Sequence, residues 1–154
     1  MAKGKKFRGA EIVREIDDAL DKGFARFLIK TQGKLSKNAP VDTGRFASSW
    51  FIGQGVPNRK VADQPAGSTP STYRKGVKVK QGVAGTITEE RPTQKITIDS
   101  DWYLSNNLPY AERVCLDPKY AKGGSGGGAW FTTIVNNLGQ DADKAFDFFL
   151  RKVK

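Results

Sequence analysis

The feature that most constrains the fold is a proline that ends a long helical pattern. Between positions 10 and 37, apolar residues recur at steps of three and four, as along one face of an α-helix. Pro40 has no amide hydrogen to donate, and it disfavours the helical conformation at Ala39. We therefore predict that the first helix ends by about Asn38. The apolar positions of this helix are Ile12, Ile16, Ala19, Leu20, Phe24, Phe27, Leu28 and Leu35.

The residues that follow Pro40 predict a structural corner. In the run Asp42-Thr43-Gly44-Arg45, the carboxylate of Asp42 is placed to accept hydrogen bonds from the amides of Gly44 or Arg45. This arrangement starts a short helix or an Asx-turn. Gly44 allows an unusual backbone dihedral angle or a close backbone approach. Trp50 is one of the bulky apolar residues through which the corner leads into an extended segment.

The triplet Asp42-Thr43-Gly44 is also the active-site triplet of aspartic proteases, in which two carboxylates share one proton across a two-fold axis. Such an enzyme needs an apolar strand directly before the aspartate and a small residue after the glycine. Here a polar run from 35 to 41 precedes the triplet, and the charge of Arg45 after it would hold Asp42 ionised. The protease is therefore the lesser alternative, and we expect no enzymatic activity.

The composition describes one domain without the usual catalytic or metal-binding residues. The chain has 154 residues, of which 38% are hydrophobic, and a mean hydropathy of -0.53. It has no histidine, which removes the usual zinc sites and His-based catalytic pairs, and its single cysteine, Cys115, sits among apolar neighbours as a buried thiol would. We predict no cofactor and no metal. No run approaches the roughly 18 apolar residues of a membrane span, and the N-terminus lacks a signal-peptide pattern, so we expect no membrane partner.

Four short patterns predict β-strands. The residues at 48–54 suit a strand, those at 77–80 alternate as an edge strand does, and 85–88 is a further candidate. The clearest pattern is 95–99, which runs on into 101–104.

Helical patterns fill the C-terminal third. Pro109 can open a short helix, and apolar spacing returns from 129 to 153, where Asp141 would cap a second piece if Gly139 divides the helix. We therefore predict an α+β fold in which two long helices pack on a small antiparallel sheet, curved or flat. A single domain is expected over 10–154.

The excess positive charge is concentrated in two segments. With 26 basic and 16 acidic residues, the formal charge is +10. The first eight residues hold four basic residues and no acid, in a basic N-terminal arm expected over 1–9. Positions 57–80 hold six basic residues and Asp63, a net of +5 (6 − 1), in a long polar loop over 56–80 that we expect to be mobile. Such segments suit phosphate backbones or acidic protein surfaces. The basic residues of this loop are Arg59, Lys60, Arg74, Lys75, Lys78 and Lys80.

A glycine-rich tract occupies 122–128, before the second long helix. Its spacing formally matches a dinucleotide-binding fingerprint. However, no predicted strand leads into it, no βαβ unit surrounds it, and the Lys-Ser/Thr pair of a P-loop is missing. We interpret the tract as a tether.

Three pieces of the chain carry a resemblance when taken together. They are the amphipathic helix over 10–37, the corner at 39–50 with its Ala-Pro-x-Asp-Thr-Gly-Arg-aromatic-x-x-Ser-Trp pattern, and a Pro-Tyr-Ala-Glu-x-Val run at 109–114 that includes Tyr110 and Glu112. In this combination the chain resembles the small tail-component or tail-completion proteins of tailed bacteriophages. It departs from that pattern after Val114, where the family has an acidic residue and a glycine and then a proline-aromatic segment.

The resemblance implies a structural virion protein of the head–tail junction. Proteins of this kind complete the tail or neck, so that a DNA-filled head can be joined to it. The resemblance further implies a homo-oligomeric ring of six or twelve copies that contacts neighbouring connector and tail-tube proteins. Such a protein would be made in the cytoplasm of the bacterial host and found in the virion. The charge of the basic loop, apart from the resemblance, suits either non-specific contact with genomic DNA or contact with a neighbouring protein.

A nucleic-acid-binding accessory protein is the alternative from another class. Its basic segments would bind duplex DNA with a steep dependence on salt. The sequence shows no helix-turn-helix spacing, zinc finger or RNA-binding sheet pattern, so such binding would not depend on base sequence.

Overall fold

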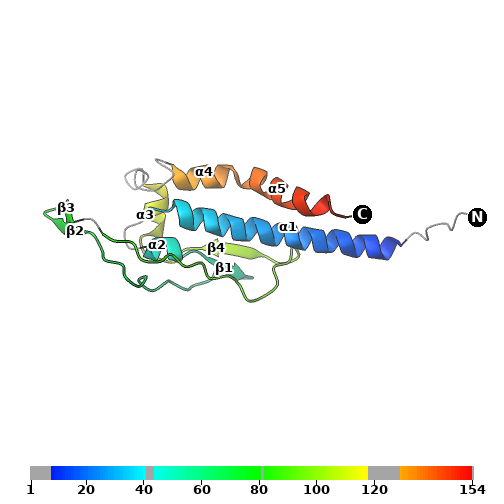
Figure 1. Cartoon of the computed structure of the whole chain (residues 1–154), viewed down its shortest axis with the longest axis horizontal. Helices are drawn as coiled ribbons and strands as arrows, with labels where there is room; N and C mark the ends of the chain where they lie inside the picture. The colour runs from blue at the N-terminus through cyan, green and yellow to red at the C-terminus, as the bar shows by residue number, and fades with distance from the viewer. Residues whose placement is uncertain (1–7, 41–43, 81, 118–128, 154) are drawn as a thin grey trace, which may run out of the picture.

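The computed structural model describes residues 8–40, 44–80, 82–117 and 129–153, and its architecture is α+β (Figure 1). The predicted fold class is confirmed, because helices pack on a small antiparallel sheet. Residues 1–7 of the basic arm predicted over 1–9, the residues Asp42 and Thr43, and the tract at 122–128 lie outside the described residues. The predicted end of the arm at 9 is wrong, because Gly9 is the first residue of the first helix. In chain order the elements are α1 (Gly9–Asn38), α2 (Arg45–Ser48), β1 (Phe51–Gln54), β2 (Thr72–Arg74), β3 (Val77–Lys80), β4 (Trp102–Ser105), α3 (Ala111–Leu116), α4 (Trp130–Asn136) and α5 (Leu138–Leu150).

Helix α1 is the centre of the molecule, with α4 and α5 along one side and the β1–β4 sheet along the other (Figure 1). Gly23 permits the close contact between α1 and α5. A Cβ atom at this position would lie 2.7 Å from Cδ1 and 3.1 Å from Cα of Phe146. Any larger residue at Gly23 would therefore push the two helices apart.

The end of α1 confirms the effect predicted for Pro40. The helix stops at Asn38, and Ala39 has an extended conformation with φ −59° and ψ 143°. The amide of Ala39 still donates to the carbonyl of Leu35 at 3.2 Å, which closes the last turn. Ala39 and Leu35 are both buried, so the turn is made inside the core.

Two apolar clusters hold the helices and the sheet together. The smaller one joins Leu28 of α1 to Ile52 of β1 and to Ile96. The larger one lies where α1 ends and α2, α3 and α4 meet. Its buried members are Leu35, Ala39, Phe46, Ala47, Trp50, Leu108, Ala111, Val114, Trp130 and Ile134.

The sheet is smaller than the strand patterns predicted. Strands β1 and β4 pair antiparallel from Phe51↔Ser105 to Gln54↔Trp102. The predicted strand at 48–54 begins only at Phe51, because Ser48 closes α2. The strands predicted at 85–88 and 95–99 are wrong, since neither segment pairs with a strand.

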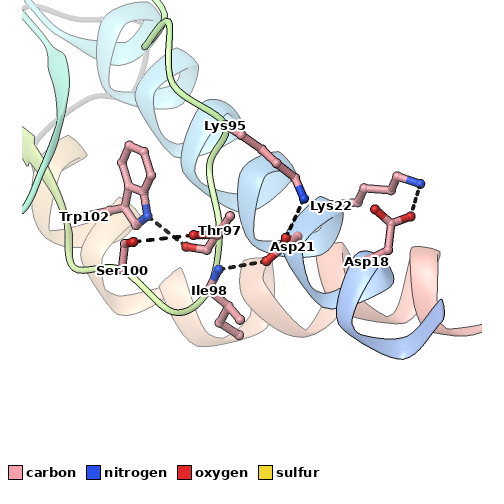
Figure 2. A network of polar contacts seen from close by, with 8 residues as sticks. All are labelled: Asp18, Asp21, Lys22, Lys95, Thr97, Ile98, Ser100 and Trp102. Atoms are coloured by element: carbon pink, nitrogen blue, oxygen red, sulfur yellow. Dashed lines mark hydrogen bonds and ion pairs between the residues drawn. The ribbon is translucent and has the colours of Figure 1, made fainter. Parts of the chain in front are cut away.

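Contacts with α1 explain why 95–99 does not form a strand. Figure 2 shows Asp21 of α1 accepting hydrogen bonds from Nζ of Lys95 at 2.8 Å and from the amide of Ile98 at 3.1 Å. The indole of Trp102 donates to the carbonyl of Thr97 at 2.9 Å. The two bonds to Asp21 fix the segment to α1, and the indole bond fixes it to the start of β4. Its alternating pattern therefore reflects packing and not sheet pairing.

The C-terminal helix is divided two residues earlier than predicted. The break falls at Asn137, whose amide donates to the carbonyl of Ile134 at 3.1 Å, and Gly139 lies inside α5. Asp141 does not cap a new helix there. Its carboxylate forms an ion pair with Lys34 of α1, which adds a polar contact between the two helices. Within the described residues, no helix is long and apolar enough to cross a membrane.

The contacts of Asp21 predict a pH-dependent contribution to stability. Its hydrogen bond from Lys95 and, to a lesser degree, the amide of Ile98 hold the pKa of this carboxyl below its usual value, against the opposing effect of desolvation. A lowered pKa in the folded state stabilises the protein above the unfolded pKa of about 4, and the contribution is lost as the pH falls through the folded value.

We expect Asp21→Ala to lower the free energy of unfolding by about 1 kcal/mol at pH 7, measured by urea denaturation. Asp21→Asn is the matched control, because it keeps an acceptor for the amide of Ile98. Asp21→Asn should lower the free energy of unfolding less than Asp21→Ala does, since the ion pair that it loses involves an exposed lysine. The difference in the free energy of unfolding between wild type and Asp21→Ala should become smaller below about pH 4. Equal losses for both variants, with no change as the pH falls, would contradict this account.

Candidate functional site: a basic hairpin held by the corner

The corner forms a short helix that begins at a glycine with a positive φ angle. Gly44 has φ 89°, in the left-handed region, and α2 follows directly at Arg45. This confirms the unusual dihedral angle predicted for Gly44. The predicted capping by Asp42 lies outside the described residues, as does Thr43. Pro40 and Gly44 are the described residues on either side of positions 41–43, between α1 and α2.

Two serines and an arginine of the corner hold the chain segments that lead to and from the β2–β3 hairpin. We call 56–68 the outgoing segment and 84–94 the returning segment. On the outgoing side, Arg45 donates from Nε to the carbonyl of Ala62 at 2.9 Å. The hydroxyl of Ser49 accepts from the amide of Ala62 at 3.2 Å and donates to the carbonyl of Arg45 at 2.7 Å. On the returning side, the hydroxyl of Ser48 accepts from the amide of Thr88 at 3.1 Å.

The two segments also contact each other beside the corner. A Cβ atom at Gly85 would lie 2.6 Å from the carbonyl oxygen of Ala66 and 2.7 Å from Cβ of Pro65. Gly44 lies next to the same place, because a Cβ atom there would be 3.4 Å from the carbonyl oxygen of Gly85. The contact needs glycine at 85, since backbone atoms occupy the space of a side chain.

Asn58 fixes the start of the outgoing segment to the sheet. The side-chain amide of Asn58 donates to the backbone carbonyl of Ile52 at 3.4 Å. The backbone carbonyl of Asn58 accepts from the hydroxyl of Ser105 at 2.7 Å. The side-chain amide of Asn107 donates to the backbone carbonyls of Asn58 and Lys60. The first part of the predicted loop is thus bound to the body along the edge of β1.

The second part of that loop is a β-hairpin that extends away from the body at one end of the molecule (Figure 1). Its strands are β2 and β3, and the edge strand predicted at 77–80 is confirmed. The two residues between the strands, Lys75 and Gly76, have φ angles of 49° and 77°. Positive φ at both positions is the mark of a type I′ turn, which suits two-residue hairpins. The amides of Thr69 and Val83 each donate to the carbonyl of the other, at 2.9 and 2.8 Å, and so extend the ladder.

The hairpin carries strong positive charge without a neighbouring acid in the sequence. We define the basic hairpin as residues 69–80 with 82 and 83; it contains Arg74, Lys75, Lys78 and Lys80 and no Asp or Glu. Every residue of β3 is exposed. Strand β3 alternates, so Val77 and Val79 share one face and two lysines share the other. A two-stranded hairpin without a covering layer is at best marginally stable in water.

The six basic residues predicted as a contact therefore fall into two groups. Four belong to the basic hairpin. Arg59 and Lys60 instead line a groove of about 800 Å³ along β1, together with Glu90 and Arg91. Lys60 forms an ion pair with Glu90 of the returning segment. Strand β2 lies within the stretch expected to be loop, and the expected mobility stays a prediction.

The structure joins the corner to the motif at 109–114 through aromatic side chains. The ring of Phe46 lies 6.0 Å from Trp50, 6.2 Å from Tyr110 and 6.2 Å from Trp130, measured between centroids. Trp50 and Tyr110, both predicted as motif residues, are thus brought together around one phenylalanine. Glu112 is exposed on α3 and does not join this group.

Features that could support catalysis are sparse in the described part of the chain. Burial raises the pKa of the Cys115 thiol to about 11, so the thiol is protonated at neutral pH and a poor nucleophile. Within the described ranges, no cluster of three or more His, Cys, Asp or Glu side chains is placed to hold a metal ion.

No family model matches this chain, and no curated protein or solved structure matches it either. The resemblance to phage tail proteins consequently rests on the motif residues themselves. Sequence reasoning missed Ser48, Ser49 and Asn58 as the residues that hold the hairpin segments. The adjacent serines of the corner pattern were the available signal for two of them, because a hydroxyl close to a helix end often bonds to the backbone.

Loss of the Ser49 hydroxyl should loosen the outgoing segment. Ser49 is fully buried, so Ser49→Ala would leave the amide of Ala62 without its acceptor. We expect the free energy of unfolding to fall by about 1 kcal/mol in urea denaturation, and amide hydrogen exchange around Ala62 to accelerate. Thr132→Ala, which removes an exposed hydroxyl on α4, is the control and should change stability by less than about 0.5 kcal/mol. The same exchange rate around Ala62 in both variants would show that Ser49 does not hold the segment.

Proposed function

We propose that this chain is a structural protein of the head–tail junction of a tailed bacteriophage, where it acts in a ring that completes the tail or neck. The observation that carries the proposal is the common core of the two motif segments. Phe46 of the corner packs on Trp50 and on Tyr110, which lies sixty residues further along the chain than Trp50 (110 − 50). The resemblance therefore links residues that form one structural unit.

The form of the chain supports a role in assembly. A long helix pair gives a stable body, and the corner holds an exposed basic hairpin at one end of it (Figure 1). Exposed valines and cations on the hairpin offer contacts to a neighbouring protein. In a ring, each such contact is repeated by every copy, so contacts that are individually weak act together.

The aspartic protease receives no support from the described residues. Helix α1 occupies the chain up to Asn38, where the protease would need an apolar strand leading to Asp42. Arg45 opens a helix, whereas the protease would have a small residue there. The absence of enzymatic activity remains part of the proposal.

Deletion of the gene provides the test in the phage. We expect electron micrographs of lysates to show DNA-filled heads and separate tails that do not join, and a copy of the gene supplied in trans should restore complete virions. Normal virions from the deletion strain would contradict the proposal. A block in DNA packaging would contradict it as well, because the proposed role follows filling of the head.

One observation favours the nucleic-acid-binding alternative as a second candidate. The basic hairpin places four cationic residues on an exposed element with no acid among them. Such an element can contact phosphates without reading bases.

The two functions differ in what the isolated protein should bind. An accessory protein should bind duplex DNA by itself, and the slope of log K against log salt should be about −0.9 for each phosphate contacted. Replacement of Arg74, Lys75, Lys78 and Lys80 by Gln should then abolish binding in fluorescence anisotropy. For the junction protein, we expect the same replacement to impair attachment of tails to heads, with little change in melting temperature because the side chains are exposed. Tight, salt-sensitive DNA binding together with normal tail attachment by the Gln variant would favour the alternative.

A further inference from the structure

The first turns of α1 form an exposed end with unburied apolar residues. Every residue from 10 to 18 is exposed, on all sides of the helix. Ile12, Ile16, Ala19 and Gly23 follow one another at steps of four, three and four, so they share one face. Gly23 on this face packs against Phe146 of α5. Figure 1 shows that α1 runs on beyond the end of α5, and there Ile12 and Ile16 are 37% and 38% exposed.

This end of α1 is acidic. From 9 to 21 the helix contains one basic residue and five acids, a net of −4 (1 − 5), formed by Arg14 with Glu11, Glu15, Asp17, Asp18 and Asp21. Three of the acids form ion pairs inside the chain, with Arg8, Lys22 and Lys95. Glu15 and Asp17 have no ion-pair partner among the described residues. Both are exposed. Glu15 flanks the face that carries Ile12 and Ile16, whereas Asp17 lies on the other side of the helix, because residues two apart on a helix do not share a face. We call residues 9–18 the acidic helix end.

The basic hairpin has the complementary properties. It carries a charge of +4 from four basic residues and no acid. Its exposed apolar side chains include Val77 and Val79, which are 66% and 58% exposed. The two surfaces lie at opposite ends of the long axis of the molecule, with β2 and β3 at one end and the start of α1 at the other (Figure 1). The hairpin of one subunit therefore cannot contact the acidic helix end of the same subunit.

We propose that the basic hairpin of one copy docks on the acidic helix end of the next copy. The contact covers Val77 and Val79 with Ile12 and Ile16, and it brings Arg74, which is opposite Val77 in the hairpin, close to Glu15. Lys80 and Asp17, on the other faces of the hairpin and the helix, add attraction at longer range. Because the two surfaces differ, the interface is heterologous, and repetition of it gives a ring when the rotation between copies closes. The inference rests on the proposed function in one respect, that the chain acts as an oligomer, and it identifies the surfaces that join the copies.

The test uses the purified full chain, so that Lys3, Lys5 and Lys6 contribute to every measurement. Molecular mass from light scattering and sedimentation should rise with protein concentration at low salt and less so at high salt. The hairpin reversal, Arg74→Glu with Lys80→Glu, and the helix reversal, Glu15→Lys with Asp17→Lys, should each weaken association at least about tenfold, because the charges at positions 74 and 15 then repel and the net charges of the two surfaces no longer attract. Circular dichroism melting should show that both variants stay folded.

The decisive step mixes the two variants. In the mixture, the unchanged hairpin of one variant meets the unchanged helix end of the other, and the two reversed surfaces also attract, so association should return. A single chain with both reversals should associate as well. Lys37→Glu with Lys144→Glu is the control, since it makes the same charge change as the hairpin reversal at exposed positions outside both surfaces, and it should leave association near the wild-type level.

Three results would overturn the inference. They are a wild-type protein that stays monomeric at every concentration, association that neither reversal weakens, and loss of association in both variants without recovery in the mixture. The proposed function is judged separately, by the heads and tails of the deletion strain. A junction defect in that strain together with a failed mixing experiment would reject these surfaces and keep the function.

Discussion

The position of the chain outside the helices depends on side chains that hydrogen-bond to the backbone of segments far away in the sequence. Gln32 of α1 is fully buried. Its side-chain amide donates to the backbone carbonyl of Trp50 at 2.8 Å and to that of Glu90 at 2.9 Å. It thereby fixes the start of β1 and the returning segment to the same point of the helix. A buried amide that lost such partners would cost about 1–3 kcal/mol, a large fraction of the stability of a small domain.

This dependence follows from the distribution of apolar residues. The two clusters lie along α1 and at the junction of the helices, and the outgoing and returning segments contribute little to them. The sheet has only two strands and cannot organise those segments by backbone pairing. The two segments are held instead by hydrogen bonds with side chains. Ser49 and Asn58 hold the outgoing segment, and Ser48 holds the returning one. The result is a well-packed body that presents a hairpin whose own strands are exposed.

The sequence predicted features whose causes are local. Pro40 determines where α1 ends, Gly44 permits the positive φ angle at the corner, and the alternation at 77–80 marks an edge strand, because each depends on neighbouring residues. The cations of the hairpin could be identified for the same reason. The strand prediction for 95–99 was wrong, because the same alternation arises when Ile96 packs on α1 and Asp21, far away in the chain, accepts a hydrogen bond from the backbone amide of Ile98.

Other parts of the structure required knowledge of distant contacts. The division of the C-terminal helix at Asn137 and the ion pair of Asp141 with Lys34 depend on how α5 lies on α1. The serines that hold the hairpin segments have acceptor or donor groups thirteen and forty residues away. Nothing in the local pattern specifies those distances. The exposure of the acidic helix end likewise depends on α5, which stops short of it (Figure 1).

The corner presents an exposed hairpin, and we propose that this hairpin becomes covered when copies assemble. Amide hydrogen exchange, followed by mass spectrometry on the isolated subunit and on the assembled protein, tests it most directly. We expect the amides of β2 and β3 to exchange fast in the isolated subunit and markedly more slowly after assembly, while those in the middle of α1 exchange slowly in both states. Equally fast exchange of the hairpin amides in both states would show that assembly does not cover the hairpin, which would then be a passive linker.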